Sequence, residues 1–84
     1  MRLDVFLKLV GVSKTRMNAK RLCDSGRVRL RGAPLKPSRE VQAGEEFEVQ
    51  FPLKSIQLKV LGVPPGNSLA KADRGLYALR TESE

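Results

Sequence analysis

The chain has 84 residues, which is enough for one small domain, and its 40% hydrophobic content permits a folded core. Lysine and arginine number 16 against nine acids, so the net charge is +7, and histidine is absent. With no histidine and one cysteine, the sequence excludes thiolate–imidazole pairs, Ser-His-Asp sets and zinc clusters. We therefore expect cationic contact with a polyanion, and no enzyme activity, cofactor or metal.

The charge is unevenly distributed along the chain. Residues 1–39 carry 11 lysines and arginines against two acids, whereas residues 40–84 carry five against seven. The basic first part is expected to face a phosphate-rich partner, and the second part is expected to serve as structural support for the first. No apolar run approaches the roughly 20 residues of a membrane span. Asp4 and Lys8 interrupt the apolar N-terminus, so we expect no signal peptide and no membrane partner, and the single cysteine fits a reducing cytoplasm.

Residues 2–10 are predicted to form the first helix. Asp4 lies in its first turn, where a negative charge favours the helix dipole, and Gly11 is expected to end it. The apolar residues recur at the spacing of a helix with one buried face: Leu3, Phe6, Leu7 and Val10.

Residues 15–32, TRMNAKRLCDSGRVRLRG, are expected to organise the rest of the fold. Ser13 or Thr15 caps a second helix, and Gly26 ends it in the left-handed conformation. Arg16 and Lys20 share a solvated face of this helix, because they are four residues apart. The opposite face is assigned to the core and consists of Ala19, Leu22 and Cys23.

The remaining residues are predicted to form a small sheet. Residues 27–31 alternate three arginines with two apolar residues, as in a strand with one buried face, and a turn at 31–32 leads to a return strand. Residues 47–51 and 56–60 read as further half-buried strands, whereas 69–79 could form a short helix or a strand. Three of the four aromatic side chains are assigned to the core, which leaves too few for a base-stacking surface: Phe6, Phe47 and Phe51.

Four motifs stand out in about the first 50 residues. They are RLDxFL at 2–7, TRxxAKxLCDSGRV at 15–28, a glycine at position 32 and KPSREVxxGEEFEV at 36–49. Together they resemble the alpha-L RNA-binding domain, which is named for the fourth small-subunit ribosomal protein. The chain further resembles the stand-alone family of the ribosome-quality-control factor P and the fifteen-kilodalton heat-shock protein, with a weaker match at AKADRGLYAL.

The resemblance implies an α+β fold in which two antiparallel helices pack on a small twisted sheet, with a short C-terminal strand and a further short helix. Residues 1–51 would form the alpha-L RNA-binding domain, and residues 52–84 a C-terminal strand and tail packed on the same domain.

The resemblance also implies a function. Members of this family bind the free large ribosomal subunit that still carries a stalled peptidyl-tRNA, and we expect this chain to be a monomer. They contact ribosomal RNA and hold the tRNA in the P site. In bacteria with the quality-control elongation factor, which is a further candidate partner, this holding supports the addition of a C-terminal tail that marks the nascent chain for degradation.

The family motif implies a set of RNA-binding residues when it is transferred position by position. Asp4 belongs to the motif and is expected to orient Arg2 or another arginine through a salt bridge. The residues expected to contact RNA are, first, Arg2, Arg16, Lys20 and Arg27, and second, Lys14, Arg31, Lys36, Ser38 and Arg39.

Two alternatives remain open from the sequence. The chain could bind structured RNA more generally, for example during assembly of ribosomal subunits. It could also be a protein–protein adaptor whose acidic second part, including Glu46 and Glu48, is the working surface. If peptidyl-tRNA on the subunit increases affinity, the first alternative is excluded. If charge reversal at the two glutamates affects binding more than loss of Arg16, the second alternative is favoured.

Overall fold

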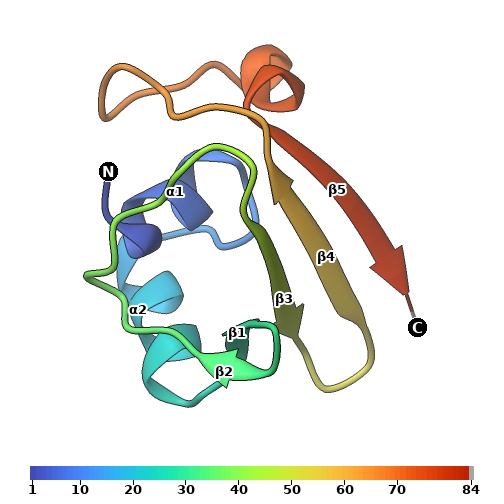
Figure 1. Ribbon diagram of the computed structural model, residues 1–84. Helices are drawn as coiled ribbons and strands as arrows, with labels where there is room; N and C mark the ends of the chain where they lie inside the picture. Colours follow the sequence, from blue (N-terminus) through green and yellow to red (C-terminus); the bar gives the residue numbers. More distant parts are fainter. Residues whose placement is uncertain (84) are drawn as a thin grey trace.

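The computed structural model describes residues 1–83, and it places two short helices against a five-stranded antiparallel sheet (Figure 1). The strand order is β2-β1-β3-β4-β5, so the first hairpin and the last strand lie at opposite edges. This arrangement confirms the α+β class. The elements are α1 (Leu3–Leu9), α2 (Arg16–Asp24), β1 (Val28–Leu30), β2 (Ala33–Pro34), β3 (Glu46–Gln50), β4 (Ser55–Val60), the 3-10 helix η1 (Lys71–Leu76) and β5 (Ala78–Ser83).

The second helix begins and ends where its sequence signals place it. The Thr15 hydroxyl accepts a hydrogen bond from the Asn18 N–H at 3.0 Å, so Thr15 is the N-cap. Gly26 has a φ of 75°, as expected for a glycine that follows a helix. Ala19 and Cys23 are buried, whereas Leu22 is only partly buried and packs at the margin of the core. The assignment of Leu22 to the buried face is therefore only partly right.

One buried cluster joins both helices to the sheet. Strands β3 and β4 alternate, with Phe47 and Ile56 buried against the helices and the intervening polar residues on the other face. Burial raises the pKa of the Cys23 thiol to about 11, with smaller contributions from the nearby Asp4 and Asp24 carboxylates. Cys23 is therefore a protonated packing residue at neutral pH.

Phe51 departs from the predicted core. It follows β3 and is only partly buried, so its ring reaches the surface beside α2. Tyr77 is also partly buried and packs against the core. The alternation of apolar residues in 47–51 predicted which way Phe51 points, but its ring stays only partly buried where it borders the surface beside α2.

The C-terminal segment forms both a helix and a strand. After η1, β5 pairs with β4 along its whole length, from Ala78 opposite Val60 to Ser83 opposite Ser55. Arg74 donates to the carbonyl of Leu9 at 3.2 Å, at the C-terminal end of α1, where a cation is favourable. No helix in the described part of the chain is long and apolar enough to cross a membrane.

Candidate nucleic-acid interface

A buried carboxylate holds two arginines together at the N-terminal ends of the helices. Asp4 is only 1% exposed, and it accepts hydrogen bonds from Arg2 (3.1 and 3.2 Å), from Arg16 (3.4 Å) and from the Val5 N–H (2.8 Å). The Arg2 and Arg16 side chains remain 42% and 56% exposed. This confirms that Asp4 forms salt bridges with Arg2 and a second arginine. We call these three residues the Asp4 cluster.

The electrostatics of the Asp4 cluster predict a pH-dependent stability. Burial alone raises the pKa of Asp4, but the hydrogen bonds from Arg2, Val5 and Arg16 outweigh burial and hold the pKa below its ordinary 3.8. A carboxyl whose pKa is depressed in the folded state stabilises the fold above the unfolded pKa. This contribution is lost as the pH falls below about 4, toward the pKa that Asp4 has in the folded state.

We therefore expect Asp4→Asn to be less stable than wild type near pH 7 and to lose less stability on acidification. Urea midpoints at about pH 7 and pH 3 measure this difference. Glu45, whose pKa is lowered chiefly by a hydrogen bond from Arg39, is present in both proteins and contributes equally. Equal acid-induced shifts in the two midpoints would show that the Asp4 carboxylate is not linked to folding.

A groove of about 580 Å³ runs between α2 and the segment that follows β3. Three cations lie along it, Lys14, Arg21 and Arg27, and none of them forms an ion pair with another of residues 1–83. Its apolar surface includes Leu22 and Phe51. We call this feature the α2 groove, and it combines unneutralised positive charge with an apolar floor.

The other predicted residues are spread over the same half of the molecule. Lys20 pairs with Asp24 one turn further along α2, at 3.0 Å. Lys36 and Ser38 are exposed in the connection between β2 and β3. Arg39, in contrast, is engaged within the fold: its guanidinium binds the Glu45 carboxylate through two hydrogen bonds.

Arg31 lies away from Arg27, at the other end of β1. It occupies the turn between β1 and β2 with a φ of 52°, a left-handed conformation that costs a non-glycine residue about 1–2 kcal/mol. The two arginines are four residues apart along an extended segment, which separates them by about 13 Å. The structure therefore does not bring Arg31 into the α2 groove.

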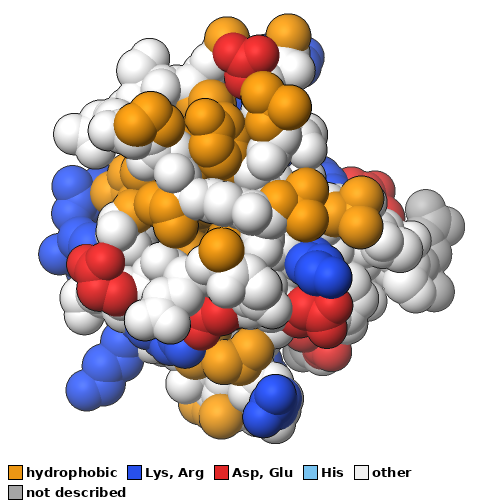
Figure 2. All heavy atoms as spheres, turned by 45° about the horizontal axis from the view of Figure 1, so that its top comes forward, with side chains coloured by type: hydrophobic (Ala, Val, Ile, Leu, Met, Phe, Trp, Pro, Cys, Tyr) orange, Lys and Arg blue, Asp and Glu red, His pale blue; other side chains and the backbone are white. Residues whose placement is uncertain are grey.

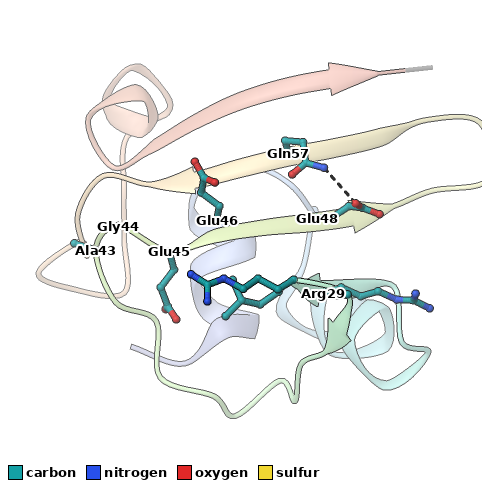
Figure 3. A pocket seen from close by; sticks show the side chains of 10 residues that line it. Arg29, Ala43, Gly44, Glu45, Glu46, Glu48 and Gln57 are labelled. Atoms are coloured by element: carbon teal, nitrogen blue, oxygen red, sulfur yellow. Dashed lines mark hydrogen bonds between the residues drawn. The ribbon is translucent and has the colours of Figure 1, made fainter.

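A second hollow, on the open face of the sheet, has a different electrostatic character (Figure 3). Glu45, Glu46 and Glu48 line it together with Arg29 and Arg31. Glu48 accepts a hydrogen bond from Gln57 of the neighbouring strand at 3.2 Å. Because carboxylates and guanidinium groups are mixed here, this hollow is a poor site for a polyanion. Among residues 1–83, no group of three or more acids and cysteines is placed to hold a metal ion.

The face formed by the segment between β4 and β5 is apolar rather than basic. Figure 2 shows hydrophobic side chains gathered across it, with lysine and arginine side chains near the margins. Leu61, Val63 and Leu76, which lie between β4 and β5, are exposed hydrophobic residues. The loop at 63–67 also borders a shallow hollow with Arg2 and Arg16, so the Asp4 cluster lies where the basic and apolar surfaces meet.

Sequence reasoning missed two residues of the α2 groove, Arg21 and Phe51. Arg21 is three residues from Asn18 and four from Ser25, so these side chains share the helix face that borders the groove. That spacing could have identified Arg21. Nothing in the alternation of residues 47–51 could have shown that Phe51 is half exposed, because this depends on which segments cover the end of the sheet.

Comparisons with known proteins agree with this geometry. The S4 domain family model matches residues 1–47, which include the Asp4 cluster and most of the α2 groove. The chain is 37% identical over 78 residues to the RQC P-site tRNA stabilizing factor of Helicobacter pylori strain J99, covering 92% of each protein. It is 33% identical over 84 residues to the factor of the same name from Streptococcus pneumoniae, covering 99% of this chain and 93% of the relative.

Two solved structures share the fold. The trimeric structure of Vibrio cholerae heat shock protein 15 superposes with a TM-score of 0.84 at 21% identity, covering 96% of this chain and 81% of that one. The solution structure of a hypothetical protein superposes with a TM-score of 0.82 at 32% identity and covers both chains completely. The second of these therefore matches the full architecture, including the C-terminal strand.

Proposed function

Because the chain belongs to the S4 domain family, and within it to the family of RQC P-site tRNA stabilizing factors, we propose that it stabilises P-site tRNA during ribosome quality control. In this function it binds, as a monomer in the cytoplasm, the large ribosomal subunit that carries a stalled peptidyl-tRNA. It contacts ribosomal RNA and tRNA without catalysing a reaction. The held tRNA then supports C-terminal tailing of the nascent chain, with the quality-control elongation factor as a partner.

The placement of unneutralised cations carries this proposal. Lys14, Arg21 and Arg27 have no acidic partner among residues 1–83, and the exposed Arg2 and Arg16 share the single carboxylate of Asp4. The acids of β3, in contrast, face the open side of the sheet. The surface around α2 is therefore positive over a wide area, as expected for a protein that binds phosphates.

The geometry favours recognition of RNA shape over recognition of base sequence. A-form RNA has a deep and narrow major groove that side chains cannot read, so contacts concentrate on phosphates and ribose hydroxyls. Arginine suits this task because its planar guanidinium group can make paired hydrogen bonds with a phosphate. Asp4 fixes one edge of Arg2 and one of Arg16 and thereby orients the remaining donors outward.

We predict that Arg16→Ala lowers affinity for large subunits about tenfold and reduces the slope of log affinity against log salt by about one. The reason is the loss of one phosphate contact and of the counterion that it releases. Co-sedimentation of the purified protein with large subunits across a salt series measures both quantities. Lys59→Ala, on the outer face of the sheet, is the matched control that removes the same charge elsewhere.

The other candidate functions predict different results. If Arg16→Ala behaves like Lys59→Ala, Arg16 is not part of the RNA-binding surface. If charge reversal at Glu46 and Glu48 reduces binding more than loss of Arg16, the working surface is the acidic strand and the protein is an adaptor. Binding that does not depend on the tRNA would instead indicate a general factor for subunit assembly.

A further inference from the structure

We propose that the α2 groove takes one unpaired nucleotide of an RNA strand, with its base on the Phe51 ring and its phosphates on the surrounding cations. The proposal rests on the proposed function for the RNA partner, and it adds a task for Phe51, which that function does not use. The groove is the only one of the hollows described above in which an aromatic side chain and unneutralised cations occur together.

The floor of the groove is suited to a base. Phe51 is held in place by its backbone, since its N–H donates to the Lys54 carbonyl at 2.8 Å across a tight turn. The Lys54 ammonium lies 5.8 Å from the ring centroid, and Phe51 borders both the α2 groove and the hollow at the turn that contains Lys54. The backbone at Phe51 is therefore held in place, and its ring is partly exposed where it borders the groove. Unpaired bases stack on such aromatic side chains, whereas bases within a duplex are already stacked.

The rim of the groove is suited to the sugar-phosphate backbone. Lys14 lies before α2, Arg21 within it and Arg27 just before β1, so cations approach the groove from three segments of the chain. The three residues make no ion pair among residues 1–83, and their charges are available to a phosphate. Cations around an aromatic floor are the arrangement used by proteins that bind unpaired nucleotides.

Polar groups beside the floor provide contacts for the edge of a base. The Ser25 hydroxyl already donates to the Leu22 carbonyl at 3.1 Å, and the Ser13 hydroxyl to the Thr15 carbonyl at 3.0 Å, but each oxygen can still accept. The Asn18 side chain also lines the groove and offers both a donor and an acceptor. The groove volume of about 580 Å³ falls within the range of about 300–1,000 Å³ that is usual for small-molecule sites.

The test compares two RNA hairpins that differ in one unpaired residue. One hairpin carries a single bulged 2-aminopurine, and the other is fully paired. We expect the full-length protein to bind the bulged hairpin about tenfold more tightly and to change the fluorescence of the 2-aminopurine as it stacks. Phe51→Leu should remove this preference, because leucine keeps apolar volume but has no aromatic face, and it should leave binding to the paired hairpin and its salt slope unchanged.

The controls separate the groove from the rest of the protein. Leu53→Ala changes a largely exposed residue in the adjacent turn and should keep the preference for the bulge. Circular-dichroism melts are used to check that each variant is folded. Equal binding of the two hairpins by wild type, or an unchanged preference in folded Phe51→Leu, would overturn this proposal. If the wild-type protein does not bind large subunits at all, the proposed function is overturned instead.

Discussion

Phe6→Ala is expected to lower the free energy of unfolding by about 3–5 kcal/mol. The Phe6 side chain is fully buried in α1, within the cluster that joins both helices to β3 and β4. Truncation removes apolar surface from the core and leaves a cavity that the surrounding strands cannot fill. Because a small domain has a total stability at the low end of about 5–15 kcal/mol, this loss consumes much of it.

Urea unfolding followed by circular dichroism measures the loss. Leu53→Ala provides the control, since Leu53 is 88% exposed and its truncation should change stability by no more than about 0.5 kcal/mol. A loss below about 1 kcal/mol for Phe6→Ala would mean that the packing between α1 and the sheet is not what holds the fold together.

Replacing Lys14, Arg21 and Arg27 together with alanine is expected to lower affinity for large subunits about a thousandfold at roughly 0.1 M salt. Each cation offers at least one charge-assisted hydrogen bond, worth about 1.5 kcal/mol at the lower end, and every 1.4 kcal/mol is a factor of ten. The salt slope should fall by about two to three, because three phosphate contacts are lost. All three residues line the α2 groove, so their loss removes its positive charge.

The control for this variant removes the same net charge from other places. Lys8, Lys59 and Lys71 are exposed and lie outside the α2 groove, so their joint replacement by alanine should reduce affinity far less. Co-sedimentation across a salt series compares the two triple variants. Similar losses would mean that overall charge, and not the groove, drives binding.

The helices and their ends could be predicted because their signals are local. Gly26 adopts the left-handed conformation that only a residue without a side chain takes easily, and Thr15 caps α2 through its own hydroxyl. The pairing of Asp4 with Arg2 was also within reach, since the two residues are neighbours in the motif. The salt bridge from Arg16 spans 12 positions, and only the packing of α2 beside α1 brings it about.

Features that depend on coverage by distant segments could not be predicted. Periodicity places Leu22 and Phe51 on inward faces, but both lie at the margin of the core and are only partly covered by residues 1–83. The composition of residues 69–79 weakly favours helix, and a short 3-10 helix does form at Lys71–Leu76. The strand that follows, Ala78–Ser83, depends on pairing with β4 and could not be predicted from composition. Arg39 looked free in the sequence, and its engagement with Glu45 depends on the path of an irregular connection.

The most direct test of the proposed function is co-sedimentation of the wild-type protein with large subunits that carry, or lack, a stalled peptidyl-tRNA. At moderate salt, we predict enrichment on the subunits that carry the tRNA, because the positive surface around α2 then meets phosphates of ribosomal RNA and tRNA together. Equal binding to empty subunits would contradict a function in stabilising P-site tRNA.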